Sequence, residues 1–123
     1  MKLTNTLASQ LAALMGFLGV ALGAFGAHGL KELLARHGTA GIWERAVLYH
    51  LVHAVMLFIL ARRSPIAARP WWSFFAGIIL FSGSLYLLAV TGAHWLGAIT
   101  PFGGIGFLVG WFWLLIDRNG GES

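Results

Sequence analysis

Cysteine is absent from this sequence, and charged residues are scarce. Without cysteine the chain holds no disulfide, no thiolate metal site, no iron–sulfur cluster and no cysteine nucleophile. Charged residues make up only 10% of the 123 positions, against roughly a quarter in a soluble globular domain. Hydrophobic residues make up 59%, and the mean hydropathy is +0.81. The composition therefore excludes an ordinary soluble domain and indicates a membrane protein with room for one domain.

Two long stretches of the chain carry no charge at all. One has 28 residues between Lys2 and Lys31, and the other has 47 residues between Arg69 and Asp117. Because about 20 apolar residues cross a bilayer as a helix, the first stretch has room for one span and the second for two. With a further span between them, the sequence predicts an all-α integral membrane bundle of four transmembrane helices. This single domain covers residues 1–123, with spans at about 7–27, 43–61, 71–90 and 101–116.

Particular residues mark the ends of these spans. Arg62 ends the second span, which is long enough only if Trp43 and the stem of Arg62 reach the two interfaces. Thr100 and Pro101 are typical of an N-cap followed by a first-turn proline, so the fourth span is expected to begin there. The preceding residues 94–99 are too polar and too rich in glycine to extend that helix.

A short amphipathic segment separates the first two spans. Between residues 30 and 37 the leucines fall on one helical face and the charged side chains fall elsewhere. Gly38 follows at the position of a C-cap. Because two turns are too short to cross a bilayer, we expect a short amphipathic interfacial helix between helices 1 and 2.

The basic residues are spread over the loops and ends rather than gathered on one face. The formal net charge is +4, but a scattered distribution indicates no nucleic-acid partner. Four spans place both termini on one side of the membrane, and that side is expected to carry five basic residues against three on the other. They are Lys2, Arg62, Arg63, Arg69 and Arg118 against Lys31, Arg36 and Arg45. Since basic residues favour the cytoplasmic side, both termini are predicted to be cytoplasmic.

Glycine is unusually frequent, with 17 residues, and its spacing indicates helix packing. In the first span small residues recur at three- and four-residue steps, so they line one face. Close backbone approach at such positions supplies the contacts that hold helices together in lipid. The glycines expected to pack in this way are Gly16, Gly19, Gly23 and Gly26 in the first span and Gly106 and Gly110 in the fourth.

Polar side chains within or beside the spans are the candidates for function, because they are costly in lipid. Sorted by depth, they fall in the outer half of the bilayer and leave the inner half nearly apolar, which disfavours an ion path through one subunit. We expect them to form one pocket that opens to the outer side. The candidates are His28, Glu44, Tyr49, His50, His53, Ser82, Ser84, Tyr86 and Thr100.

His50 and His53 lie three residues apart on one helix, so both could face a common partner. A metal or haem site usually needs further ligands, and few lie within reach. We therefore expect neutral imidazoles hydrogen-bonded between helices, with no metal and no other cofactor. No hydrolase motif such as GxSxG or HExxH is present, so the sequence predicts a protein that is not an enzyme.

Four segments of the chain resemble the signature blocks of a known family. They are Gly23-Ala24-Phe25-Gly26-Ala27-His28-Gly29-Leu30, Tyr49-His50-Leu51-Val52-His53-Ala54, Leu80-Phe81-Ser82-Gly83-Ser84-Leu85-Tyr86 and Ile99-Thr100-Pro101-Phe102-Gly103-Gly104. In this order, over nearly the whole chain, they are similar to the blocks of small four-helix membrane proteins known as domain of unknown function 423, or uncharacterised protein family 0382. The resemblance implies a multi-pass protein of the bacterial inner (plasma) membrane, and it implies no particular activity.

Three kinds of function remain open. The first is a small interaction, ligand-binding or lipid-binding protein whose polar pocket lies in the outer half of the bilayer. The second is a transporter or channel for ions or small solutes, formed by an oligomer. The third is a metal, haem or redox subunit that uses His50 and His53. The expected partners are the lipid bilayer and either a second copy of the chain or another membrane protein.

Overall fold

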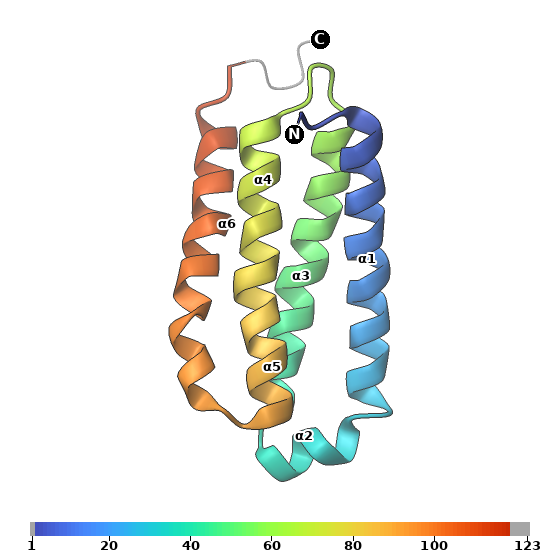
Figure 1. Cartoon of the computed structure of the whole chain (residues 1–123), viewed down its shortest axis with the longest axis vertical. Coiled ribbons are helices and arrows are strands. Elements are labelled where there is room, and N and C mark those ends of the chain that lie inside the picture. Colours follow the sequence, from blue (N-terminus) through green and yellow to red (C-terminus); the bar gives the residue numbers. More distant parts are fainter. Residues whose placement is uncertain (1, 119–123) are drawn as a thin grey trace.

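The computed structural model describes residues 2–118, which form helices and turns without any strand. The elements, in chain order, are α1 (Asn5–Ala27), α2 (Lys31–His37), α3 (Ala40–Ala61), α4 (Ala68–Gly77), the π-helix η1 (Ile78–Ser82), α5 (Gly83–Thr91), the 3₁₀-helix η2 (His94–Ala98) and α6 (Thr100–Leu115). Figure 1 shows the longer helices side by side as columns, joined by short connections. The predicted all-α class is therefore confirmed.

Four helical segments are long and apolar enough to cross a membrane. They are Asn5–Ala27, Ala40–Ala61, Ala68–Thr91 and His94–Leu115. The third consists of α4, η1 and α5 in direct succession, and the fourth consists of η2 and α6. The predicted integral membrane architecture of four spans is confirmed, although each span begins a few residues before the position expected from the sequence.

The start of α6 differs from the prediction. Residues 94–98 continue the fourth span as a tight 3₁₀-helix, and Thr100 is the first residue of α6 rather than its cap. Thr100 does not cap the helix with its side chain, because its Oγ1 lies 2.7 Å from Oγ of Ser84 on α5. A contact between two spans thus replaces the local contact that the Thr-Pro pair predicted.

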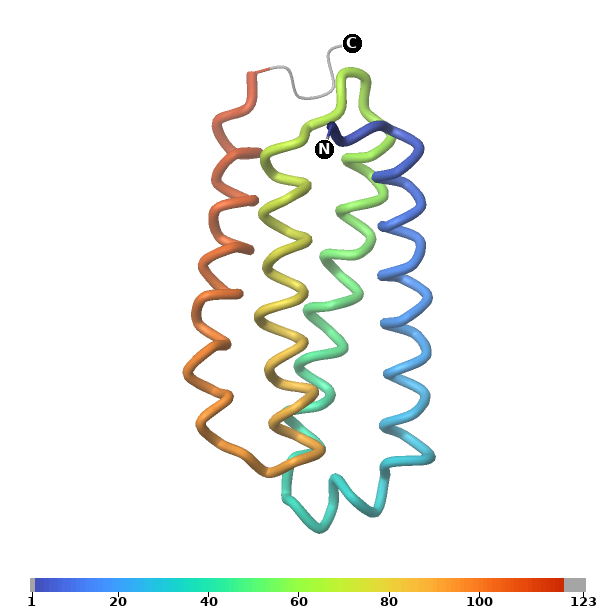
Figure 2. Tube along the Cα trace, in the orientation of Figure 1, coloured from blue at the N-terminus to red at the C-terminus, as the bar shows by residue number. Residues whose placement is uncertain are grey.

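The four spans are arranged so that α3 and the third span occupy the middle. α1 packs along α3, α3 also contacts α4, η1 and α5, and α6 packs on α4 and η1. Figure 2 traces this order and shows that α1 begins at the same end of the molecule at which α6 finishes. At that end the Arg63 guanidinium forms an ion pair with Asp117 at 2.8 Å, which ties the α3–α4 connection to the end of α6.

The opposite end is closed by α2. Leu34 is buried there, whereas Lys31, Glu32 and Arg36 are exposed, so the predicted amphipathic helix is confirmed. Gly38 caps it in the left-handed conformation, with φ 65°. The next residue, Thr39, is buried and donates a hydrogen bond to the Ala89 carbonyl at 2.7 Å.

Trp43 is buried in the first turns of α3. It is 4% exposed, its Nε1–H donates to the Leu22 carbonyl at 2.9 Å, and its ring lies 4.7 Å from the ring of Tyr86. Because α3 begins at Ala40, Trp43 is its fourth residue. Its side chain therefore packs between α1 and α5 rather than on the outer surface of the molecule.

Glycines allow close contacts along two pairs of helices. A Cβ built on Gly19, Gly23 or Gly26 would meet side chains of α3, and one on Gly106 or Gly110 would meet α4. Gly16 was also predicted to pack against a neighbouring helix, and that prediction is wrong, because a Cβ built on Gly16 meets nothing within 4 Å. Gly16 is thus on the open side of α1 and contributes nothing to this packing.

Within the described residues, the closest approach of a glycine to the backbone of another helix was not predicted from the sequence. A Cβ built on Gly103 would lie 2.6 Å from Cα and 2.7 Å from Cβ of Phe81, and it would also overlap the Phe81 backbone nitrogen. Since these are mostly backbone atoms, they cannot turn away as a side chain does. The contact between α6 and η1 therefore requires glycine at residue 103.

Candidate functional site

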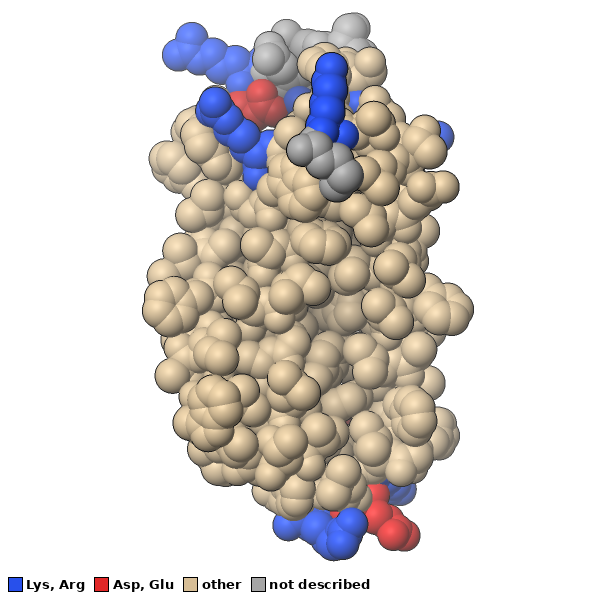
Figure 3. All heavy atoms as spheres, in the orientation of Figure 1, with Lys and Arg blue, Asp and Glu red and all other residues tan. Residues whose placement is uncertain are grey.

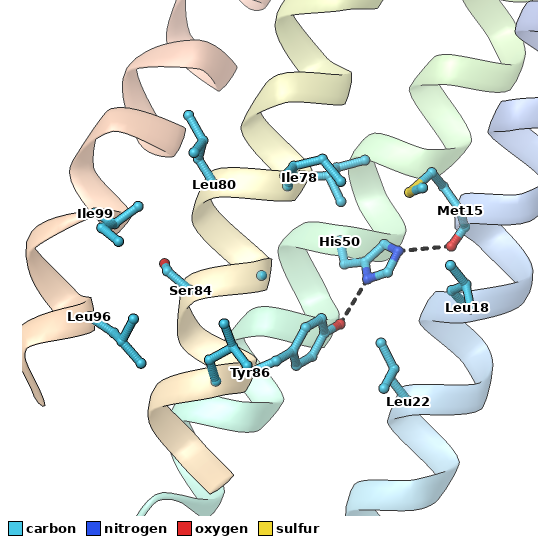
Figure 4. A pocket seen from close by; sticks show the side chains of 13 residues that line it. Met15, Leu18, Leu22, His50, Ile78, Leu80, Ser84, Tyr86, Leu96 and Ile99 are labelled. Atoms are coloured by element: carbon cyan, nitrogen blue, oxygen red, sulfur yellow. Dashed lines mark hydrogen bonds between the residues drawn. The ribbon is translucent and has the colours of Figure 1, made fainter. Parts of the chain in front are cut away.

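A cavity of about 420 Å³ lies between α1 and the third span. Apolar side chains make up most of its wall: Met15, Leu18 and Leu22 from α1, Ile78, Ile79 and Leu80 from η1, Leu87 from α5, and Leu96 and Ile99 at η2 (Figure 4). Several of these, including Leu18, Leu80 and Leu87, are also exposed on the outside of the molecule. The rim of the cavity thus faces the region that lipid would occupy.

The π-helix η1 contributes one wall of this cavity. Within residues 78–82 the backbone is wound more loosely than in an α-helix, a feature that occurs often at functional sites. Ser82, at the end of η1, is fully buried and donates to the Ala46 carbonyl of α3 at 2.7 Å. That bond holds the third span against α3 beside the cavity.

Three polar side chains line the cavity: His50, Ser84 and Tyr86. His50 Nε2 lies 2.8 Å from the Met15 carbonyl oxygen, and His50 Nδ1 lies 2.8 Å from the Tyr86 hydroxyl. Figure 4 shows the imidazole between these two partners, so it links α1 to α5. Since a carbonyl oxygen only accepts, Nε2 carries the proton, and in the neutral ring Nδ1 accepts the Tyr86 O–H.

The third polar side chain of the cavity, Ser84, is also satisfied within the protein. Its Oγ donates to the Phe81 carbonyl at 3.0 Å and lies 2.7 Å from Thr100 Oγ1. Ser84 and Thr100 therefore form a polar link between α5 and α6. Thr100 itself does not line the cavity.

His53 belongs to a different contact, between α3 and α6. Its ring stacks on Phe107 with a centroid distance of 3.7 Å, and Trp111 Nε1–H donates to His53 Nε2 at 3.0 Å. The other nitrogen, Nδ1, lies 2.8 Å from the Tyr49 carbonyl and therefore carries the proton. Tyr49 is 40% exposed and packs against Phe81. His53 thus has the opposite tautomer from His50 and no nitrogen left for a ligand.

The other two candidates lie toward the α2 end. His28 is the exposed C-cap of α1. Glu44 is exposed and lines a second cavity of about 340 Å³ between α1, α2 and α3, together with Gly26, Trp43 and Leu48 among others. The nine candidates therefore do not share one pocket, because the spans turn them toward different neighbours.

Both histidines lie near the middle of α3. This helix has 22 residues, and His50 and His53 are its eleventh and fourteenth. The partner of His50 is Met15, the eleventh residue of the 23-residue α1. The contact between His50 and α1 is therefore made about halfway along both helices.

The polar side chains of the cavity wall are all hydrogen-bonded within the protein. No group of three His, Asp or Glu side chains within residues 2–118 could hold a metal ion. All four ring nitrogens of His50 and His53 face protein partners. A mostly apolar cavity of several hundred Å³ with a few polar groups is typical of sites for small apolar ligands.

Comparisons with known proteins give a consistent family assignment. The family model described as "Protein of unknown function (DUF423)" matches residues 22–104. The UPF0382 membrane protein YwdK of Bacillus subtilis (strain 168) is 44% identical over 112 residues, which cover 86% of this chain and 90% of that protein. A UPF0382 membrane protein of Staphylococcus epidermidis is 44% identical over 110 residues, with 86% and 89% covered. No solved structure gives a significant match.

Proposed function

The chain belongs to the DUF423 (UPF0382) family of membrane proteins, and from this premise we propose that it binds the apolar chain of a membrane lipid in the cavity between α1 and the third span. The single observation that supports this function is the lining of that cavity. Its walls are aliphatic, its rim reaches the lipid-facing surface, and its three polar side chains are all hydrogen-bonded within the protein. A lipid chain is the apolar molecule present at highest concentration at such a rim.

The proposed activity is binding rather than catalysis. Hydrogen bonds to other protein groups engage both nitrogens of His50 as well as the Tyr86 and Ser84 hydroxyls. An enzyme of this size would need a group poised to exchange a proton or attack a substrate, and these side chains have no carboxylate beside them in the cavity wall. A partner membrane protein or a second copy of the chain would receive or deliver the lipid, and nucleic acid has no part in this function.

Filling the cavity should abolish lipid binding without unfolding the protein. Gly83 lines the cavity, and a Cβ built there meets nothing within 4 Å, so Gly83→Leu places a branched side chain in open space. We expect the amount of lipid that co-purifies with the variant to fall at least about tenfold. The variant should melt at the same temperature as the unmodified protein or slightly above it. Native mass spectrometry after purification in mild detergent measures the retained lipid.

Gly16→Leu is the matched control for Gly83→Leu. Gly16 also has nothing within 4 Å of its Cβ position, but it does not line the cavity. The Gly16→Leu variant should therefore retain as much lipid as the unmodified protein. Equal lipid retention in all three proteins would contradict the proposed function, whereas loss in both variants would show that the retained lipid sits on the outer surface.

We place the protein in the bacterial inner membrane with both termini in the cytoplasm. The visible charged residues gather at the two ends of the molecule and leave a broad uncharged belt between them (Figure 3). The end with α2 carries Lys31, Arg36 and Arg45, whereas the other end carries five basic residues. That asymmetry supports the orientation, since the cytoplasmic side attracts the excess of Lys and Arg.

Single cysteines test the orientation cleanly, because the chain has none of its own. Ala35 in α2 and Ser64 in the α3–α4 connection are both exposed and lie at opposite ends. In intact spheroplasts, a membrane-impermeant maleimide should label Ala35→Cys at once and should label Ser64→Cys only after lysis. The reverse pattern would place the termini outside.

A further inference from the structure

We infer that the lipid bound in this cavity is uncharged and bears a hydroxyl group that donates a hydrogen bond to the Tyr86 oxygen. The inference rests on the proposed function and names its ligand class. It concerns long-chain alcohols, including isoprenoid alcohols, diacylglycerols and quinols, rather than phospholipids, ketones or quinones. Two independent features of the cavity lead to it: where its protons point, and what charges it lacks.

The protons of the polar side chains in the wall are all directed at protein acceptors. The His50 Nε2–H points to the Met15 carbonyl, which leaves Nδ1 to accept from Tyr86. The single Ser84 proton goes to the Phe81 carbonyl, so Thr100 Oγ1 is the donor to Ser84 Oγ. The Tyr86 oxygen therefore keeps acceptor capacity and has no proton to offer. A ligand atom at this place is recognised only if it donates.

The cavity also lacks any charge that could accompany a charged headgroup. None of its lining residues is Asp, Glu, Lys or Arg. His50 lies at the middle of α3, where an ionised group without a partner is very costly. Alcohols and quinols with long chains meet both conditions, because they are neutral and their polar atom is a hydroxyl donor.

A matched pair of probes tests the direction of the hydrogen bond. 1-Hexadecanol and its methyl ether have the same chain, but only the alcohol donates. For the unmodified protein in detergent, the alcohol should bind about tenfold more tightly than the ether, measured by native mass spectrometry titration. Hexadecan-2-one, which only accepts, should resemble the ether, and a phospholipid should compete poorly with the alcohol.

Tyr86→Phe keeps the ring and removes the acceptor. It should bind the ether as the unmodified protein does and lose most of the preference for the alcohol, because the acceptor that it leaves behind, His50 Nδ1, lies 2.8 Å from the position of the missing oxygen. A melting curve shows whether Tyr86→Phe is folded. If the variant is unfolded, the comparison of the alcohol with the ether on the unmodified protein still tests the inference. If the unmodified protein binds the alcohol and the ether with equal affinity, and Gly83→Leu binds neither, then the inference about the hydroxyl group is wrong and the lipid site stands.

If Gly83→Leu binds both probes as well as the unmodified protein does, the lipid site itself is wrong.

Discussion

Replacing Gly103 with alanine should prevent α6 from packing in its native position. The added methyl group would overlap the backbone of Phe81 in η1, including its Cα at 2.6 Å. Because neither backbone can rotate away, the two spans must separate, and the contacts of Phe107 and Trp111 with His53 are then lost as well. Overpacking of this kind costs about 3 kcal/mol or more. We expect a fall in melting temperature of about 10 °C or more, or no monodisperse protein.

The adjacent glycine provides the control for this substitution. A Cβ on Gly104 meets only one atom, Cδ2 of Phe81 at 4.0 Å, which is an ordinary contact distance. Gly104→Ala should therefore melt within a few degrees of the unmodified protein, and the small gain in helix propensity favours it. If Gly103→Ala and Gly104→Ala have the same melting temperature, α6 does not approach η1 as closely as the structure shows.

Gly26→Leu should have the second-largest effect, in the contact between α1 and α3 near α2. A Cβ on Gly26 would overlap Nε1 and Cδ1 of Trp43 and lie 3.0 Å from Cε2. Trp43 cannot move aside easily, because it is buried, bonded to the Leu22 carbonyl and packed on Tyr86. The substitution must displace the indole, break its hydrogen bond and separate α1 from α3. We expect a loss of about 3 kcal/mol, read as a lower melting temperature.

The same helix offers a control for the added leucine. Gly16→Leu adds an equal side chain to α1 where nothing lies within 4 Å, so it should melt close to the unmodified protein. Intrinsic tryptophan emission adds a second readout, because Gly26→Leu should shift it as Trp43 leaves its buried site. Similar melting temperatures for the two leucine variants would refute the packing of α1 on α3 at this level.

The number and type of the helices could be predicted from the sequence, because hydropathy and charge act locally. Runs without charge marked the spans, and the leucine pattern of α2 identified a helix too short to cross. The interhelical hydrogen bonds expected for His50 and His53 are present, and the bond that His53 Nε2 accepts from Trp111 requires a neutral ring. In each case the deciding quantity is the free energy of placing side chains in lipid, which depends on the residues of one segment alone.

The relative placement of the helices could not be predicted in the same way. In a membrane span every face is apolar, so periodicity does not show which face meets a neighbour. Gly16 and Gly19 look equivalent in the sequence, yet only Gly19 meets α3. The π-helix η1 and the burial of Trp43 likewise depend on contacts between spans. For this reason the polar residues, expected in one pocket, are divided between the cavity wall and separate interhelical contacts.

Photo-crosslinking shows where on the protein the bound lipid lies. The probe is 1-hexadecanol with a diazirine at the end of its chain, and labelled peptides are identified by mass spectrometry. We expect labels on cavity-lining side chains of α1 and α5, such as Leu18, Leu22 and Leu87. Unlabelled hexadecanol should suppress these labels, and Gly83→Leu should remove them. The lipid does not lie in the cavity if the labels are spread evenly over exposed α6 residues such as Leu108 and Leu115 and are unchanged in Gly83→Leu.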